Sequence, residues 1–276
     1  MVKKYIDGES KAERKARKRN DKETLQEVVK VHSEPVVKNN DNRYVVCLKY
    51  GDKYGPEYVN KLHSMVKRHL TLPYEFVCFT ERPQGIDPEI RIEKLDLIPG
   101  IQGWWYKPMF FNPDLPIKGN ILFLDLDIII FNNIDKLFTY KTNEFCIIRD
   151  FNRYIIRDYN KFNSSIFRLN NFNRTHSNVY QEFIKDPKVP MSRFHGDQDW
   201  IRFCIQKNYN YWPDEWIQSY KWEMRNRPKF DNKPRGQRDF AEKGDPVVKD
   251  ATSVAVFHGD PNPHICKDQW VIDNWN

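Results

Sequence analysis

The chain has 276 residues, of which 39% are hydrophobic and 14% aromatic, and its formal net charge is +7. These values are typical of a folded protein with ample core for one large domain or two small ones. No apolar run approaches the roughly 20 residues needed to cross a bilayer, so we expect no membrane span. The first residues lack a sustained apolar face. We therefore expect a charged tail or helix at 1–42 and one folded domain at 43–276.

The distribution of charge and cysteine bears on partners and location. Much of the positive excess lies in KAERKARKR at 11–19, so we expect no nucleic-acid partner. This segment is either a solvated tail or an arm that binds phosphates or a membrane surface. The N-terminus has no apolar segment typical of a secretory signal, and five cysteines are scattered without a C-x-x-C pair. We therefore expect a cytoplasmic protein with reduced, buried thiols.

From residue 44 onward, strand-like and helix-like segments alternate. The strand-like runs are YVVCLKY (44–50), YEFVCFT (74–80), IRIEKLDL (90–97), ILFLDLDIIIF (121–131), EFCIIRD (144–150), SSIFRLN (164–170) and SVAVFHG (253–259). Apolar spacing predicts helices over 58–70, 104–111, 177–186 and 197–207. This alternation predicts an α/β fold with a mostly parallel central sheet flanked by helices. Residues 211–250 show no clear period and are expected to form a long loop region with helical pieces.

The most hydrophobic strand-like run, at 121–131, contains two acids, Asp125 and Asp127. Alternate side chains of a strand share a face, so both carboxylates are expected to face the same spot. Two such anions repel each other unless a cation lies between them, and carboxylate oxygens suit Mn²⁺ or Mg²⁺ bridging a diphosphate. A structural role as strand-end caps or salt-bridge partners is one alternative. The other is a D-x-D phosphatase of the haloacid-dehalogenase type, whose nucleophile normally follows the first strand.

Four segments, in order, resemble those of GT-A glycosyltransferases, in particular glycosyltransferase family eight or a close neighbour. ILFLDLDIIIFNNIDKLF (121–138) is similar to their D-x-D segment, FNSSIFRLN (162–170) to the strand that lines the donor sugar, GDQDWI (196–201) to the D-Q-D helix start, and VFHGDPNPH (256–264) to the C-terminal His motif. The resemblance implies a Rossmann-like GT-A fold. It also implies a metal-dependent hexosyltransferase that moves a sugar from a nucleotide-diphosphate donor, a UDP-sugar, to an unidentified acceptor with retention of configuration.

The resemblance also implies roles for particular residues. Asp125, Asp127 and His258 are expected to bind the metal, and Gln198 and Asp197 to contact the donor sugar at the catalytic centre. Asp197 also has the position of a helix N-cap. Residues expected to bind the donor are Tyr50, Gly51, Tyr54, Thr80, Lys107, Asp125, Asn163, Ser164, Gly259 and Lys267. The family's C-terminal lysine is replaced by Asn262, so Lys107, Lys221 or Lys267 would supply that positive charge.

Several aromatic residues leave their role open. Tyr50 and Tyr54 follow the first strand, where an α/β sheet receives its ligand, and would either stack on the base or pack in the core. Trp212, Trp216, Tyr220 and Trp222 would either stack on acceptor sugars or pack in the protein. A protein that binds a sugar nucleotide without catalysis is a further alternative to the enzyme.

Overall fold

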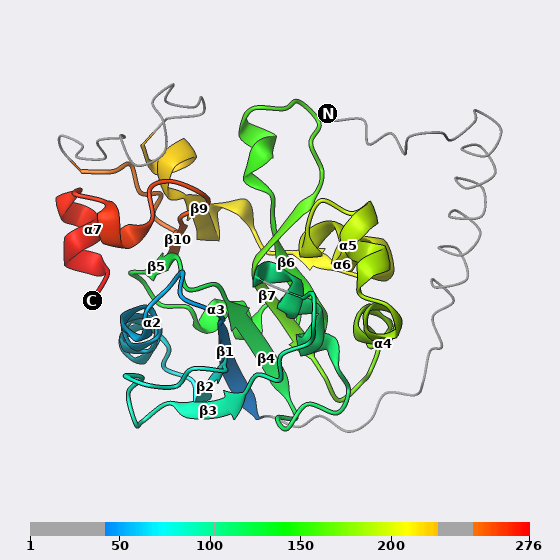
Figure 1. Ribbon diagram of the computed structural model, residues 1–276. Coiled ribbons are helices and arrows are strands. Elements are labelled where there is room, and N and C mark those ends of the chain that lie inside the picture. Colours follow the sequence, from blue (N-terminus) through cyan, green and yellow to red (C-terminus); the bar gives the residue numbers. More distant parts are fainter. Residues whose placement is uncertain (1–41, 102, 226–244) are drawn as a thin grey trace, which may run out of the picture.

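The computed structural model describes residues 42–101, 103–225 and 245–276 (Figure 1). The charged segment expected at 1–42 lies, except for Asn42, outside the described residues, so the domain boundary at this point stays a prediction. The same holds for the part of the expected loop region at 226–244.

A seven-stranded sheet forms the centre of the fold, in the order β3-β2-β1-β4-β7-β6-β8 (Figure 1). The strands are β1 (Arg43–Lys49), β2 (Glu75–Thr80), β3 (Arg91–Lys94), β4 (Asn120–Leu124), β6 (Cys146–Arg149), β7 (Phe162–Asn170) and β8 (Asn210–Tyr211). All neighbouring pairs are parallel except those of β7, which runs antiparallel to both β4 and β6. The expectation of a mostly parallel α/β sheet is confirmed.

The strand expected at 121–131 is divided between the central sheet and a second, smaller sheet. It has the order β5-β10-β9, with β5 at Ile128–Ile130, β9 at Ile217–Ser219 and β10 at Val254–Val256. The amide of Asp125 still bonds to the carbonyl of Ser165 in β7, at 2.8 Å, whereas the carbonyl of Asp127 accepts from the amide of Phe257, at 3.1 Å. The chain thus changes sheets between the two acids, and the expected single strand is wrong.

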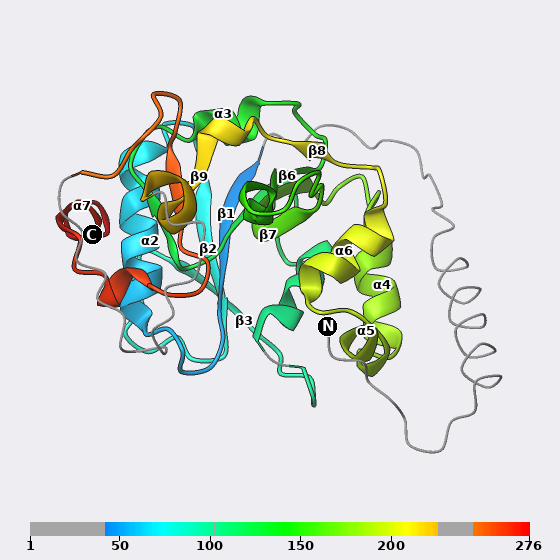
Figure 2. The ribbon, with the colours of Figure 1, turned by 90° about the horizontal axis from the view of Figure 1, so that it is seen from above.

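Helices cover both faces of the central sheet, with α2 on one side of β1 and α4, α5 and α6 on the other (Figure 2). The α-helices are α2 (Pro56–His69), α3 (Asp135–Thr139), α4 (Asn178–Lys185), α5 (Lys188–Arg193), α6 (Asp197–Ile205) and α7 (Gln269–Asn274). Short 3-10 helices occupy Gly103–Phe111, Phe151–Tyr154, Asp214–Trp216 and Pro263–Ile265, and a π-helical turn occupies Tyr220–Met224. None of the described helices is long and apolar enough to cross a bilayer.

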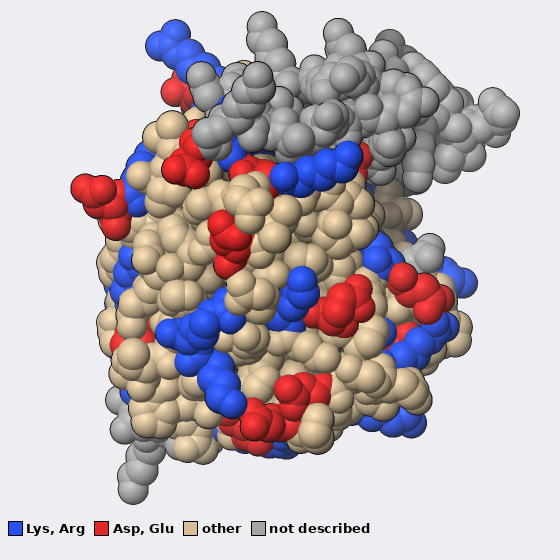
Figure 3. Space-filling view, turned by 90° about the vertical axis from the view of Figure 1, so that its left-hand side faces the viewer, with Lys and Arg blue, Asp and Glu red and all other residues tan. Residues whose placement is uncertain are grey.

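The two helical layers create two cores, because successive residues of a strand point to opposite faces. In β1, Val45 and Cys47 pack in the core beside α2, whereas Val46 packs in the core beside α4 and α6. Burial on both faces explains why the central strands are continuous apolar runs. All five cysteines are buried as single thiols. On the face formed by α2 and α7, acidic and basic side chains are interspersed (Figure 3).

Candidate active site

A cavity of about 710 Å³ opens where β1 and β4 end and β7 begins. Because β7 runs antiparallel to β4, its first residues lie beside the carboxyl end of β4. The start of α6 and the 3-10 helix Gly103–Phe111 supply the remaining walls. The cavity brings together most of the predicted site residues, namely Tyr50, Gly51, Tyr54, Lys107, Asp125, Asp127, Asn163, Ser164, Asp197 and Gln198. Segments far apart in the sequence therefore meet at one edge of the sheet, where α/β folds bind their ligands.

Asp125, which is partly exposed, forms an ion pair with the buried Lys107. The lysine Nζ lies 2.9 Å from Asp125 Oδ1 and donates to the carbonyl of Ser164 at 3.2 Å. The Lys107 side chain is 7% exposed. Burial alone would lower the pKa of Lys107, but the charges of Asp125 and then Asp197 outweigh burial and raise it. The cavity wall therefore contains a permanent positive charge.

Asp127 has a neutral partner. Tyr54 donates its hydroxyl to Asp127 Oδ2 at 2.9 Å, and the same hydroxyl lies 3.2 Å from Asn262 Oδ1. Burial, followed by the negative charge of Asp125, raises the pKa of Asp127 to about 6. The two carboxylates thus repel each other across the break between β4 and β5, and Asn262 connects the C-terminal segment to the same place.

The start of α6 is fixed by two polar contacts. Ser164 donates its hydroxyl to Asp197 Oδ2 at 2.6 Å, and Gln198 donates its side-chain amide to Asp150 Oδ2 at 3.3 Å. Burial raises the pKa of Asp197 although Lys107 acts against it. The N-cap of α6 is Gly196, so the expectation that Asp197 caps the helix is wrong: its side chain points to Ser164 instead.

Four predicted residues do not line the cavity: Thr80, His258, Gly259 and Lys267. The hydroxyl of Thr80 accepts a hydrogen bond from the amide of Arg82 at 3.0 Å, which fixes the turn after β2. Gly259 has a φ of 75°, in the left-handed region that favours glycine, and Lys267 is exposed. The structure therefore places these four residues outside the lining of the cavity, and their roles stay predictions.

His258 is placed among aromatic rings, not beside the two acids. Its ring stacks on Phe151 with centroids 5.1 Å apart, meets Trp222 edge-on, and its Nε2 lies 2.6 Å from Ser219 Oγ. Burial, and then the charge of Lys221, lowers the pKa of His258 to about 3, so the ring is neutral. Among the described residues, no group of three or more His, Cys, Asp and Glu side chains is placed to hold a metal ion. The expected triad of Asp125, Asp127 and His258 is thus not assembled.

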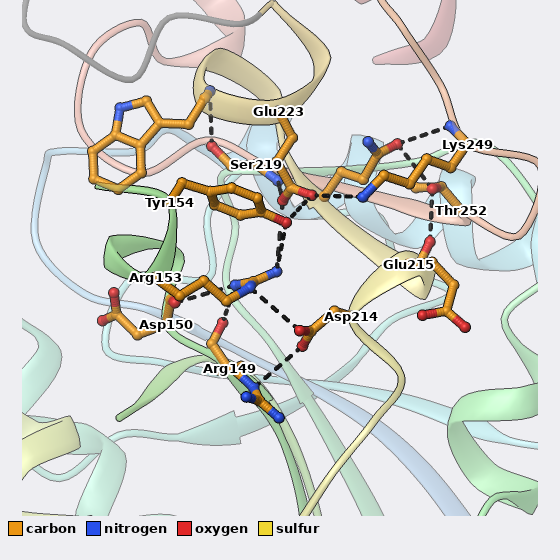
Figure 4. Close-up of polar contacts among 12 residues, drawn as sticks. Arg149, Asp150, Arg153, Tyr154, Asp214, Glu215, Ser219, Glu223, Lys249 and Thr252 are labelled. Carbon is orange, nitrogen blue, oxygen red and sulfur yellow. Dashed lines mark hydrogen bonds and ion pairs between the residues drawn. The ribbon is translucent and has the colours of Figure 1, made fainter. Parts of the chain in front are cut away.

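A polar network holds the loop between β6 and β7 against the segment that carries Ser219 (Figure 4). Its centre is Glu223, whose side chain is 3% exposed and accepts from the amide of Ser219 at 2.8 Å. Tyr154 donates its hydroxyl to the same carboxylate, and Arg153 and Lys249 pair with it at 3.7 and 3.2 Å. Through Ser219 the network reaches His258. No local sequence pattern predicts this network, because its members lie in three separate segments.

Some residues that line the cavity were not predicted from the sequence. Trp104 is 56% exposed, and it lies at the cavity with Lys53 and Met191. The expected helix at 104–111 carried Trp104, but an aromatic residue in an apolar run is usually read as core. Conversely, Trp212 and Tyr220 are buried, and Trp216 and Trp222 pack against the same core. Packing therefore accounts for the aromatic residues after 211 better than sugar stacking does.

The solved structures similar to this chain include glycosyltransferases. An active-site mutant of LgtC aligns with 83% of this chain and 93% of its own, at a TM-score of 0.59 and 12% identity. The galactosyltransferase LgtC in complex with donor and acceptor sugar analogs aligns over the same shares, at a TM-score of 0.58 and 14% identity. The apo form of the glycosyltransferase GlyE from Streptococcus pneumoniae TIGR4 aligns with 80% of this chain, at a TM-score of 0.53 and 15% identity.

The coverage and sequence identity of these matches limit what can be concluded from them. This chain spans 46% and 56% of the length of two GlyE chains that it matches. No protein-family model matches the sequence, and no curated protein is significantly similar to it. At these identities the likeness shows the fold alone: an α/β fold of the GT-A type, with a mostly parallel seven-stranded sheet flanked by helices.

Proposed function

We propose that this chain is a metal-dependent glycosyltransferase that moves a hexose from a nucleotide-diphosphate donor, a UDP-sugar, to a saccharide, lipid or protein acceptor. The observation that carries the proposal is the pair of acids between β4 and β5, which faces a cavity together with a buried lysine. The GT-A fold supports it, since LgtC has been solved with donor and acceptor sugar analogs.

The donor set of the cavity fits a divalent cation. Asp125 and Asp127 offer hard oxygen ligands, and their mutual repulsion, visible in the raised pKa of Asp127, is what a bound cation would relieve. We propose these two side chains as the protein ligands for Mn²⁺ or Mg²⁺. His258 does not group with the two acids in the described part of the chain, so we do not include it. A bound ion would neutralise charge on the departing nucleoside diphosphate.

The other cavity residues have roles that follow from their charge and position. Lys107 would attract the diphosphate, because it holds a permanent positive charge at the wall. Tyr50, which lies 5.0 Å from Tyr106 between ring centroids, offers an aromatic surface to the base. Gln198, held by Asp150, would face the sugar and stabilise positive charge at its anomeric carbon. Retention of configuration is part of the same proposal.

The test is ligand-dependent thermal stabilisation together with donor turnover. Binding to the folded state raises the melting temperature by mass action, so a panel of sugar nucleotides with and without Mn²⁺ identifies the donor. We expect one UDP-sugar to stabilise the chain, and Mn²⁺ to strengthen the effect. Asp127→Asn should abolish both the metal effect and turnover. The control Asp96→Asn, whose side chain is 85% exposed, should change neither.

Three results would separate the alternatives. Full turnover in excess EDTA would overturn metal dependence. Stabilisation by a UDP-sugar without hydrolysis or transfer to any acceptor would indicate a binding protein. Release of phosphate from phosphate esters, without sugar-nucleotide binding, would indicate a phosphatase. The phosphatase has less support from the structure, because Asp125 follows the fourth strand and is paired with Lys107.

A further inference from the structure

A second cavity, of about 670 Å³, lies between the end of α5 and the outer face of α6. We call it the α5–α6 groove. It shares no lining residue with the candidate active site. Figures 1 and 2 both place α5 beside α6, at the edge of the fold away from α2 and α7. The proposed function leaves this groove without a role.

The groove follows one face of α6 away from the active site. Asp199, Arg202 and Phe203 line it, at the spacing of a single helical face, together with Gln206, the C-cap of α6. The residue before Asp199 is Gln198, which lines the active site, so the two cavities lie on either side of the first turn of α6. From Gln198 to Ile205, the last residue of α6, the helix rises about 10 Å. The groove is therefore placed to receive the continuation of a molecule whose end lies in the active site.

The charge of the groove is strongly unbalanced. Its lining contains one carboxylate, that of Asp199, and four cationic side chains: Lys161, Arg193, Arg202 and Lys207. Lys161 Nζ lies 3.4 Å from Asp199 Oδ1, so this one acid is already shared. Arg202 donates to the carbonyl of Asn160 at 3.3 Å, which orients its guanidinium and leaves further N–H donors. Such a concave basic surface attracts anions, and guanidinium groups suit phosphate and carboxylate.

Two aromatic rings form the apolar part of the groove. Phe194 and Phe203 are partly buried, with centroids 5.4 Å apart and planes at 46°. A site that combines apolar rings with a few charged groups suits an organic ligand better than a free ion. The C–H faces of a sugar ring would lie against the phenylalanines, and an acidic substituent would meet the cations.

We propose that the α5–α6 groove binds the acceptor of the proposed glycosyl transfer, and that this acceptor is an anionic saccharide carrying a phosphate or carboxylate. The identification of this ligand as an acceptor rests on the proposed function. Its chemical basis, the cationic groove with aromatic walls, is independent of that function.

The test measures binding of matched disaccharides to the full chain by isothermal titration calorimetry. The probes are a neutral disaccharide, its glucuronate-containing counterpart and its phosphate ester. We expect at least one anionic probe to bind more tightly than the neutral one at low salt, with a difference that shrinks as salt screens the charges. The double variant Arg202→Gln/Lys207→Gln should lose about tenfold or more of this affinity. Comparison of the two anionic probes identifies the acidic group.

The matched control is Lys188→Gln, which removes an exposed cation from α5 outside the groove. Equal binding of neutral and anionic probes would overturn the proposal, and so would an equal loss in Lys188→Gln. Thermal stabilisation by sugar nucleotides should be unchanged in every variant, since none of these residues lines the active site. Failure of all sugar nucleotides to bind would overturn the proposed function alone, because the disaccharide titrations do not depend on a donor.

Discussion

Arg153 and Glu223 face each other across two segments that are distant in the sequence, with Nη2 and Oε2 3.7 Å apart and side chains only 12% and 3% exposed. Arg153 lies in the loop after β6, close to Asp150, which holds Gln198. Glu223 lies behind Ser219, which contacts His258. The pair therefore joins the loop that holds Gln198 to the segment that contacts His258.

Glu223→Gln should destabilise the fold by about 1–3 kcal/mol, because it keeps the shape but removes the buried negative charge that Arg153 and Lys249 share. Urea denaturation at neutral pH measures the loss. The control is Glu182→Gln, which breaks an i,i+3 pair with Lys185 on the surface of α4 and should cost at most about 0.5 kcal/mol. Equal losses in both variants would show that the network does not couple the segments.

Lys107→Met should destabilise the metal-free protein by about 1–3 kcal/mol, because Asp125, whose side chain is 23% exposed, would keep its charge without its cation. Adding Asp125→Asn to that variant removes the unpaired charge, so the double variant should be more stable than Lys107→Met alone. Urea denaturation in EDTA tests both. Losses that simply add would contradict a direct interaction between the two side chains.

Gln198→Ala should lower kcat much more than it weakens binding of the donor. Its amide is held by Asp150 and contributes mainly when charge builds at the anomeric carbon. Asp197→Ala should instead reduce both stability and donor binding, because the buried Asp197 carboxylate accepts from Ser164 and lies near Lys107. A fall in kcat/KM with kcat untouched in Gln198→Ala would make the residue a binding contact only.

Acidification should destabilise the fold in part through His176. Burial lowers the pKa of this ring below its usual 6.5, and its Nε2–H donates to the carbonyl of Asn208 at 2.9 Å. As pH falls below about 6.5 the unfolded chain takes up a proton that the folded chain does not, so stability present at higher pH is lost. His176→Gln keeps a donor without the titration, and its unfolding midpoint should fall less between pH 7.5 and 5.5. An unchanged pH dependence would contradict this.

The sequence predicted those features that depend on local pattern. Apolar runs gave the strands of the central sheet, and apolar spacing gave α2, α4 and α6 to within a few residues. The break after Leu124 escaped prediction because Ile128–Ile130 is as apolar as β4. What separates them is pairing with Val254–Val256, a contact between distant segments that no local period reveals.

The same distinction applies to the site. Strand ends and the order of motifs were enough to place the two acids, Lys107 and Gln198 at one cavity. His258 was misplaced because the choice between Asp127 and Ser219 as its neighbour depends on how β9 and β10 lie together. The groove along α6 was also missed, since its cations come from both sides of a turn and only folding gathers them.

The position of β10 in the small sheet determines when that sheet can form during synthesis of the protein. β10 is the middle strand, yet it is synthesised last, long after β5. At about 5–20 residues per second, a ribosome needs several seconds to proceed from Ile130 to Val254. Throughout that interval Ile128–Ile130 is an apolar segment with no strand to pair with, the kind of surface that chaperones shield. The carbonyl of Asp127 likewise gains its hydrogen-bond donor, the amide of Phe257, only after that interval.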